Sequence, residues 1–377
     1  MIWTVAASLS LLIWLYLVFA HGRFWRLRQP PASNLRAERR VVAVIPARNE
    51  ADVIAESLKS LFTQYFLAPL HIVLVDDNSS DGTADVARKL AREMGRNKDL
   101  TILAGAPLPS GWTGKLWAVK QGTDEALKHQ PEYLLFTDAD IHHDGRNVAD
   151  LIAKAEADDL DLTSYMVRLC TQTLAENTLI PAFVYFFLQL YPPAWVADPK
   201  TAIAGAAGGC ILIRPSALTR IGGHAAIHGE IIDDCALAQA VKSTGGKIWL
   251  GLTPSTFSIR PYAGFSEIGR MISRSAFNQL KHSVWLLIAT LLGLAVTYLV
   301  PLIALFSGNK TAAGCGLAAW FLMSLSYAPM IRFYRLPLFY AFALPFIAIF
   351  YAGATLHSAL QYWRGRGGVW KGRAQDI

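Results

Sequence analysis

The chain has 377 residues, of which 53% are hydrophobic and 17% are charged, and its formal net charge is +7. Soluble globular chains carry about 25% charged residues, so this deficit predicts that part of the chain lies in lipid. The positive charge could bind nucleic acid, anionic lipid or an anionic substrate. No nucleic-acid-binding pattern occurs, and the basic residues flank apolar segments, which favours a membrane. These basic residues are Arg23, Arg26, Arg28, Arg36, Arg39 and Arg40, and then Arg364, Arg366, Lys371 and Arg373.

The first apolar segment covers residues 2–20 and is long enough to cross about 30 Å of hydrocarbon. No basic residue precedes it and no cleavage site of the A-x-A type follows it, which favours an uncleaved anchor over a signal peptide. We therefore expect a transmembrane anchor over residues 1–22 and a basic linker over residues 23–40. Arginines after the span predict that the following domain is cytoplasmic.

The next segment, from residue 41 to about residue 260, is predicted to be an α/β domain. Its short β-rich runs are nearly continuous in apolar residues, as in a buried, mostly parallel sheet. Helical patterns begin near Asn49, after Asp81 and at Gly114, and this alternation with strands predicts a doubly wound sheet. The expected strands are residues 41–47, 71–77, 100–105 and 133–139.

A second apolar segment, residues 179–195, is interrupted by Pro181, Pro192 and Pro193. It is too short for a regular span, so we expect either an interfacial segment beside the membrane or buried core. Both alternatives stay open from the sequence.

The C-terminal region, residues 283–377, is predicted to be a membrane region. Its candidate spans are residues 284–306, 311–330 and 338–356. Four crossings in all would leave the basic C-terminus outside, against the charge rule. A re-entrant hairpin hinged at Pro345 would remove this conflict, so the region holds two or three spans or such a hairpin.

Acidic residues follow three of the expected strands. Ligands of open α/β sheets bind outside the carboxyl ends of the strands, so these residues predict a shared crevice. Asp138 and Asp140, after the fourth strand, could hold Mg²⁺ or Mn²⁺ with open positions for substrate phosphates. The acidic groups after the first two strands are Glu50, Asp76 and Asp77.

Phosphate-binding signals are limited. No Gly-x-Gly-x-x-Gly follows the first strand, which argues against a dinucleotide oxidoreductase. Gly114-Lys115, opening a helix, could bind a diphosphate or could be an ordinary helix start. Asp233-Asp234 also enters a helix, where one carboxylate could act as a general base or could simply decorate the helix N-terminus.

Histidines and cysteines give no metal pattern. His142, His143, His224 and His228 are interpreted as surface or structural residues. The four cysteines, Cys170, Cys210, Cys235 and Cys315, have neither zinc-site nor disulfide-framework spacing and are expected to be small buried residues.

Taken together, the motifs over residues 41–260 resemble glycosyltransferase family 2, whose fold is similar to that of A-type nucleotide-sugar transferases. The matching segments are Val44–Glu50, Val75–Thr83, Gly114-Lys115, Thr137–Asp140 and Asp233-Asp234. The resemblance implies an A-type glycosyltransferase fold and a catalytic domain over residues 41–282. Gly111–Lys115, the anchor and the apolar tail resemble the hopanoid-biosynthesis-associated glycosyltransferases, with carotenoid and ceramide glycosyltransferases as neighbours.

The resemblance also implies roles for individual residues. Lys115 would lie near the uridine or diphosphate, Asp138 and Asp140 would border the sugar-diphosphate and hold the metal, and Asp234, beside Asp233, would be the catalytic base. The remaining nucleotide-sugar-binding residues would be Pro46, Asn49, Glu50, Asp76, Asp77, Arg270 and Arg274.

Arg270 and Arg274 resemble the Gln/Arg-x-x-Arg-Trp element of related enzymes. Ser275 stands in place of the tryptophan, which counts against a processive polysaccharide synthase.

The expected function is inverting transfer of a sugar from a nucleotide-sugar donor, a UDP-sugar, to a hopanoid or polyprenoid hydroxyl at the cytoplasmic membrane face. An aspartate of ordinary pKa, about 3.9, would be ionised and ready as the base. The alternatives are a polyprenyl-phosphate sugar transferase and a non-catalytic membrane scaffold that retains the fold.

Overall fold

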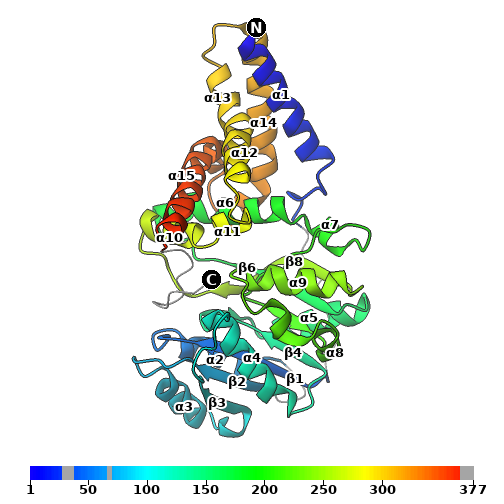
Figure 1. The fold of residues 1–377 in the computed structure, drawn as a ribbon, viewed down its shortest axis with the longest axis vertical. Helices are drawn as coiled ribbons and strands as arrows, with labels where there is room; N and C mark the ends of the chain where they lie inside the picture. The colour runs from blue at the N-terminus through cyan, green and yellow to red at the C-terminus, as the bar shows by residue number, and fades with distance from the viewer. Residues whose placement is uncertain (28–37, 66–69, 366–377) are drawn as a thin grey trace. The chain divides into compact units, whose positions relative to one another are not determined.

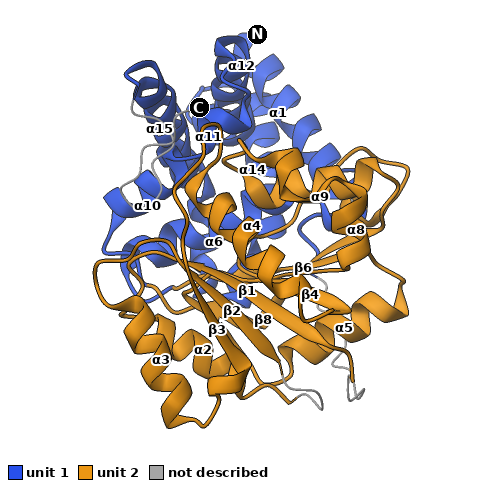
Figure 2. Cartoon of the chain, turned by 60° about the horizontal axis from the view of Figure 1, so that its bottom comes forward, with its two compact units in different colours: residues 1–27, 171–194, 261–368 blue, residues 28–170, 195–260, 369–377 orange. Residues whose placement is uncertain are grey.

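The computed structural model describes residues 1–27, 38–65 and 70–365, and it divides the chain into two compact units (Figure 2). Unit 1 comprises residues 1–27, 171–194 and 261–368, and unit 2 comprises residues 28–170, 195–260 and 369–377. The expected 41–282 segment is therefore discontinuous, because its parts 171–194 and 261–282 cluster with the helical unit. Arg28, Arg36, Arg366, Lys371 and Arg373 lie outside the described residues.

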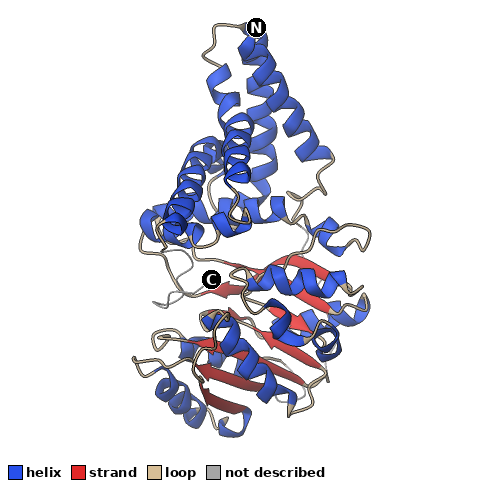
Figure 3. Cartoon of the chain, in the orientation of Figure 1, coloured by secondary structure: helices blue, strands red, loops and turns tan. Residues whose placement is uncertain are grey.

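Unit 2 is built on a mixed sheet, eight-stranded in the described residues, with the order β3-β2-β1-β4-β7-β6-β8-β5 (Figures 1 and 3). Of its seven neighbouring pairs, four are parallel: β1–β2, β1–β4, β2–β3 and β6–β8. The predicted mostly parallel α/β sheet is thus confirmed. The strands are β1 Val41–Ala47, β2 His71–Asp76, β3 Leu100–Ala104, β4 Tyr133–Phe136, β5 Ile141–His143, β6 Leu162–Arg168, β7 Ile211–Ile213 and β8 Ile248–Ser258.

Helices cover both faces of this sheet. β1 is buried along its whole length, and because its side chains alternate between the two faces, both faces are shielded from water. Ala43 and Ile45 belong to a core shared with residues of α2, α3 and α5. On the opposite face α4 approaches so closely that a Cβ at Gly122 would lie 2.5 Å from a methyl group of Val44. The helices of unit 2 are α2 Ile54–Phe62, α3 Thr83–Glu93, α4 Gly114–Leu127, α5 Asn147–Ala157, α8 Pro215–Arg220 and α9 Asp233–Ser243. The short helix α7, Pro193–Ala197, begins at the unit boundary.

Unit 1 is helical in its described residues. Four of its helical segments are long and apolar enough to cross a membrane: Ile2–Phe19, Val284–Ala304, Lys310–Phe333 and Leu338–Trp363. These segments match the predicted anchor and the three predicted C-terminal candidates, and they indicate that the chain associates with a membrane. The long helices are α1 Ile2–Phe19, α6 Leu174–Leu190, α12 Val284–Leu294, α14 Lys310–Phe333 and α15 Leu344–Trp363, and the short ones are α10 Phe265–Ser273, α11 Ala276–Gln279 and α13 Val300–Ala304.

Two prolines bear on the predicted topology. Pro345 lies in the first turn of α15, and the helix continues from there to Trp363. Pro181 lies inside α6, and the buried hydroxyl of Tyr185 on the same helix contacts Ser326 Oγ at 2.7 Å. The number of spans, the hairpin and the interfacial position of residues 179–195 stay predictions.

Candidate active site

The loops after β1 and β2 hold each other in place. Asn49 has a φ of +53°, a left-handed conformation that asparagine tolerates. Its side-chain Oδ1 accepts a hydrogen bond from Ser80 N at 2.9 Å, and its own N–H donates to Ser79 Oγ at 3.0 Å. The next residue, Glu50, donates its N–H to Thr83 Oγ1 at 2.9 Å. Asn49 therefore fixes the loop that presents Glu50.

The two carboxylates at the carboxyl end of β2 are held by neighbouring groups. Asp76 Oδ1 accepts a hydrogen bond from Ser79 N at 3.1 Å. Asp77 is only 2% exposed, and its Oδ2 lies 3.7 Å from Arg48 Nη1. The same Arg48 nitrogen donates to the backbone carbonyl of Asp77 at 2.6 Å. Arg48 therefore fixes Asp77 between the ends of β1 and β2.

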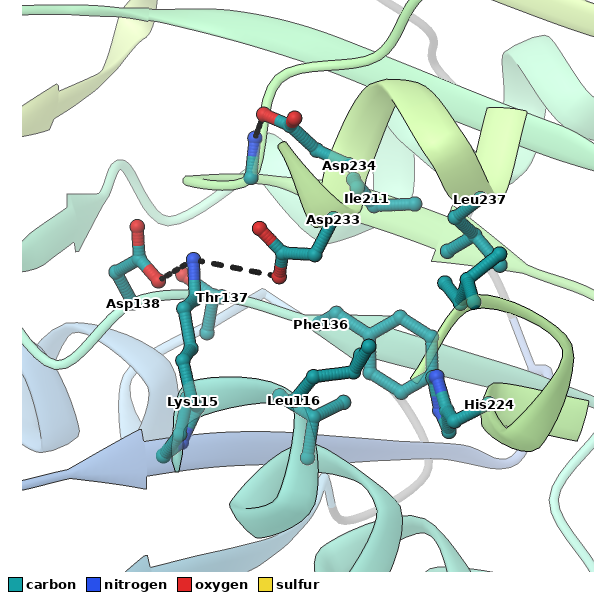
Figure 4. A pocket seen from close by; sticks show the side chains of 14 residues that line it. Lys115, Leu116, Phe136, Thr137, Asp138, Ile211, His224, Asp233, Asp234 and Leu237 are labelled. Atoms are coloured by element: carbon teal, nitrogen blue, oxygen red, sulfur yellow. Dashed lines mark hydrogen bonds and ion pairs between the residues drawn. The ribbon is translucent and has the colours of Figure 1, made fainter. Parts of the chain in front are cut away.

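Lys115, Asp138 and Asp233 form a group that we call the lysine cluster (Figure 4). Lys115 Nζ lies 2.9 Å from Asp138 Oδ1 and 3.8 Å from Asp233 Oδ2. Burial by itself lowers the pKa of Lys115, but the two carboxylates outweigh burial and raise this pKa above its ordinary value. The lysine is therefore a permanent cation between two acids that are far apart in the sequence.

Asp234 adjoins this cluster and is held by two backbone donors. Its Oδ2 accepts from Gly208 N at 2.8 Å, and its Oδ1 accepts from Cys235 N at 2.7 Å. Burial and the negative charge of Asp233 raise the pKa of Asp234 to about 6, although Lys115 and the two N–H groups act in the opposite direction. The ordinary value expected from the sequence is therefore wrong, because the carboxylate is withdrawn from water beside a second acid.

Gly208 and Gly209 connect Asp234 to the acidic turn after β4. Thr137 Oγ1 donates to Gly209 O at 2.8 Å and accepts from His143 Nε2 at 2.9 Å. Burial lowers the pKa of His143 to about 3, so this histidine is neutral and Nε2 carries its proton. A Cβ at Gly208 would lie 3.2 Å from Lys115 Nζ. This glycine pair was not predicted from the sequence, although two glycines before a buried strand were a usable signal.

Arg260, Glu50, Asp52 and Asp140 form a second group, which we call the arginine cluster. Arg260 Nη2 hydrogen-bonds Glu50, and Arg260 Nη1 lies 3.4 Å from Asp52 Oδ2. Arg260 Nε lies 3.8 Å from Asp140 Oδ2, which also accepts from Ser258 Oγ at 3.0 Å. Arg260 was not predicted from the sequence. Its only local signal is a basic residue just beyond the end of β8.

The acidic turn has the chemistry of a divalent-ion site, but an incomplete one. Asp138 and Asp140 are hard oxygen donors, and Mg²⁺ sites commonly use one or two carboxylates together with substrate phosphates. The described residues contain no group of three or more His, Cys, Asp or Glu side chains that could hold a metal ion. The two carboxylates therefore fit an ion whose remaining ligands come from a nucleotide.

A cavity of about 30 Å³ lies beside the lysine cluster, with all its lining residues in unit 2. Lys115, Asp138, Asp233 and Asp234 supply its charged wall (Figure 4). The other lining residues are Pro46, Leu116, Val119, Phe136, Thr137, Gly208, Ile211, His224, Ile227 and Leu237. Pro46 thus lines the cavity from β1.

The remaining predicted residues lie elsewhere. Arg270 and Arg274 belong to α10 and its C-terminal end in unit 1, so their role toward a donor stays a prediction. His224 is buried and contacts Thr123 Oγ1 at 3.0 Å, and burial lowers its pKa to about 4, which fits a structural histidine. His142 contacts Glu56 Oε1 at 2.9 Å, which likewise fits a structural histidine.

Comparison with known proteins agrees with the fold of unit 2. Residues 42–222 match the family described as Glycosyl transferase family 2, a match that ends before Asp233. The mannosyltransferase PcManGT from Pyrobaculum calidifontis, solved in complex with GDP-Man and Mn²⁺, has a TM-score of 0.58 at 18% identity, covering 94% of this chain and 99% of that one.

Two curated relatives match shorter segments. The probable glycosyltransferase YdaM of Bacillus subtilis is 32% identical over 94 residues, which is 25% of this chain and 21% of YdaM. The uncharacterized protein MJ1222 of Methanocaldococcus jannaschii is 30% identical over 112 residues, 30% of this chain and 40% of MJ1222. The chain therefore spans less than half the length of either relative.

The sheet and its acidic strand ends define an A-type glycosyltransferase fold, as predicted. Residues 42–222, just under half of the chain, match the model of glycosyltransferase family 2.

Proposed function

We propose that this protein is an inverting glycosyltransferase that moves a sugar from a nucleotide sugar to the hydroxyl of a membrane lipid. The observation that carries the proposal is the lysine cluster, where Lys115 joins Asp138 of the acidic turn to Asp233 of α9. Asp234 lines the same cavity. A cation and a diphosphate site would thus lie beside a candidate base, which is the combination that glycosyl transfer from a nucleotide requires.

The donor would lie along the carboxyl ends of β1, β2 and β4. Glu50 and Asp77, with Asp76 in support, would bind the nucleoside, and the Lys115 ammonium would offset negative charge on the diphosphate. A UDP-sugar is the proposed donor. Because PcManGT was solved with GDP-Man, donor tests include GDP-sugars as well.

Asp138 and Asp140 would hold Mg²⁺ or Mn²⁺, with Asp140 as the principal ligand. When bound, such an ion neutralises charge that develops on the leaving diphosphate. Lys115 keeps its own positive charge throughout, because two neighbouring carboxylates raise its pKa. It would therefore stabilise the leaving group without exchanging a proton.

Asp234 would be the base. Its carboxylate would take the proton of the acceptor hydroxyl while the hydroxyl oxygen attacks the anomeric carbon and the bond to the diphosphate oxygen breaks. One displacement of this kind inverts the anomeric centre. The two backbone N–H groups on Asp234 fix its orientation, and its pKa of about 6 makes it a stronger base than an ordinary carboxylate while it stays ionised at pH 7.

The acceptor is proposed to be a hopanoid or another polyprenoid alcohol in the cytoplasmic membrane. Four long apolar helices in the same chain support a lipid acceptor. The resemblance of the Gly111–Lys115 segment to hopanoid-associated enzymes supports the polycyclic class. Arg23 and Arg26, after the first helix, support a cytoplasmic catalytic unit.

The test is transfer of labelled sugar from UDP- and GDP-sugars into the organic extract of membranes that contain the chain, with and without Mn²⁺. Asp234→Asn should lower transfer by about 10²–10⁴-fold, the usual contribution of a general base. Asp124→Asn is the matched control, because Asp124 pairs with Lys120 on the exposed side of α4.

A phosphate acceptor needs little help from a base. Nearly full transfer in the Asp234→Asn variant would therefore favour the polyprenyl-phosphate alternative. Absence of nucleotide-sugar binding in the purified protein would instead indicate a non-catalytic scaffold.

A further inference from the structure

The arginine cluster contains a fixed cation at the place where the proposed function puts a metal ion. Arg260 contacts three carboxylates from two loops: Glu50 and Asp52 after β1, and Asp140 after β4. The side chain of Glu50 is 10% exposed and that of Asp140 is 22% exposed, so water screens this charge only in part. Arg260 thus supplies positive charge to all three acids.

Asp140 is the acid of this cluster that the proposed function makes the principal metal ligand. Its Oδ2 lies 3.8 Å from Arg260 Nε and accepts a hydrogen bond from Ser258 Oγ at 3.0 Å. Because a guanidinium stays protonated at all physiological pH values, Arg260 supplies a permanent positive charge beside this carboxylate without any metal.

A divalent ion on Asp140 would place a second cation beside the guanidinium of Arg260. Mg²⁺ binds carboxylate oxygens at about 2.0–2.1 Å, and the Asp140 oxygen nearest Arg260 already accepts a hydrogen bond from Ser258. Two positive charges in a partly desolvated site repel each other strongly. Repulsion between the two cations therefore favours movement of the guanidinium away from Asp140 when the ion binds.

We propose that Arg260 is an internal counter-cation that the divalent ion displaces, and that the displaced guanidinium then binds the diphosphate of the donor. This inference rests on the proposed function and adds a positioning residue to it. The planar fork of arginine suits phosphate oxygens as well as it suits carboxylates. Without a nucleotide, Arg260 loses its contact with Asp140, keeps Glu50 and Asp52, and gains no anionic partner in exchange. With a nucleotide, Arg260 exchanges Asp140 for the diphosphate, so the nucleotide raises the affinity for the metal ion.

The experiment measures Mn²⁺ binding by electron paramagnetic resonance on the purified full chain, with and without UDP as the nucleotide probe. Arg260→Gln should bind Mn²⁺ several-fold more tightly than the wild type in the absence of UDP. The gain in Mn²⁺ affinity that UDP produces should shrink in the same variant. Arg220→Gln is the matched control, because Arg220 pairs with Asp161 at 3.1 Å, and it should behave as the wild type.

Arg260→Lys provides a second variant with the charge retained. It should leave Mn²⁺ binding without UDP near the wild-type value and still reduce the gain from UDP, because an ammonium lacks the fork. Unchanged or weaker Mn²⁺ binding by Arg260→Gln without UDP, or a full UDP gain in both variants, would overturn the inference. If UDP does not increase Mn²⁺ binding by the wild type, the metal-dependent function proposed above fails. If UDP does increase it, and the variants behave as in the preceding sentence, only the role given to Arg260 fails.

Discussion

The lysine cluster and the arginine cluster lie at the same edge of one sheet, and each takes one carboxylate of the Asp138-Ala139-Asp140 turn. The lysine cluster joins this turn to α9 and lines the cavity. The arginine cluster joins the turn to the loop after β1 and includes Ser258 at the end of β8. Lysine is a compact charge on a flexible stem, whereas arginine has a planar, directional fork. The comparison suggests that the first cluster serves the reaction and the second prepares the cation site.

The largest difference should follow from neutralising the lysine cluster. Lys115→Gln should lower kcat by about 10²–10³-fold, the usual loss when one charge-stabilising donor is removed. Because Lys115 lowers the pKa of Asp234, the same change should also move the acidic limb of the pH profile to higher pH. Steady-state kinetics across pH measures both effects. A normal kcat, or an unmoved limb, would contradict the role given to Lys115.

Acidification should affect the lysine cluster next. The pKa of Asp234 is raised to about 6, so its proton is held more tightly than in an ordinary carboxyl group, and the base is lost as pH falls through that value. Transfer should be level above pH 7 and should fall about tenfold per pH unit well below pH 6. The residual activity of Asp234→Asn should lack this limb. A wild-type profile that stays flat down to pH 5 would refute the assignment of Asp234.

The smallest effect should come from the glycine that connects the two acidic stretches. A methyl group at Gly208 would lie 3.2 Å from Lys115 Nζ and 3.4 Å from Asp234 Oδ2. The lysine is flexible at its end and can yield, so Gly208→Ala should lower kcat by only about tenfold, well below the loss for removing a general base. Gly314→Ala is the control, because a Cβ there meets nothing within 4 Å. Equal activity of the two variants would remove Gly208 from the site.

Much of the fold was readable from local patterns. Near-continuous apolar runs gave the starts of β1, β2, β3 and β4, because a parallel strand that is buried on both faces carries few polar residues. The start of α4 at Gly114 was also predicted. The division into units was not, because α6 and α10 are separated from the other unit 1 helices in the sequence and join them only by tertiary packing.

The candidate site could be predicted where a charged residue belongs to a sequence motif, as at Lys115, Asp138 and Asp234. It was not readable for Arg260, whose partners precede it by 210 and 208 residues for Glu50 and Asp52. The raised pKa of Asp234 could not be predicted from the sequence either, because it depends on burial and on the negative charge of Asp233. Sequence gives the charged groups, and folding decides which of them meet.

The central claim is that Asp138 and Asp140 share one divalent ion and one nucleotide diphosphate. The most direct measurement is Mn²⁺ binding in the presence of UDP by the wild type and by Asp138→Asn, Asp140→Asn and Asp234→Asn. Loss of the principal ligand in Asp140→Asn should weaken Mn²⁺ binding at least as much as loss of an outer-shell partner does, about 10–100-fold, and Asp138→Asn should weaken it less. Asp234→Asn should bind Mn²⁺ as the wild type does. Wild-type Mn²⁺ binding by Asp140→Asn would contradict the account.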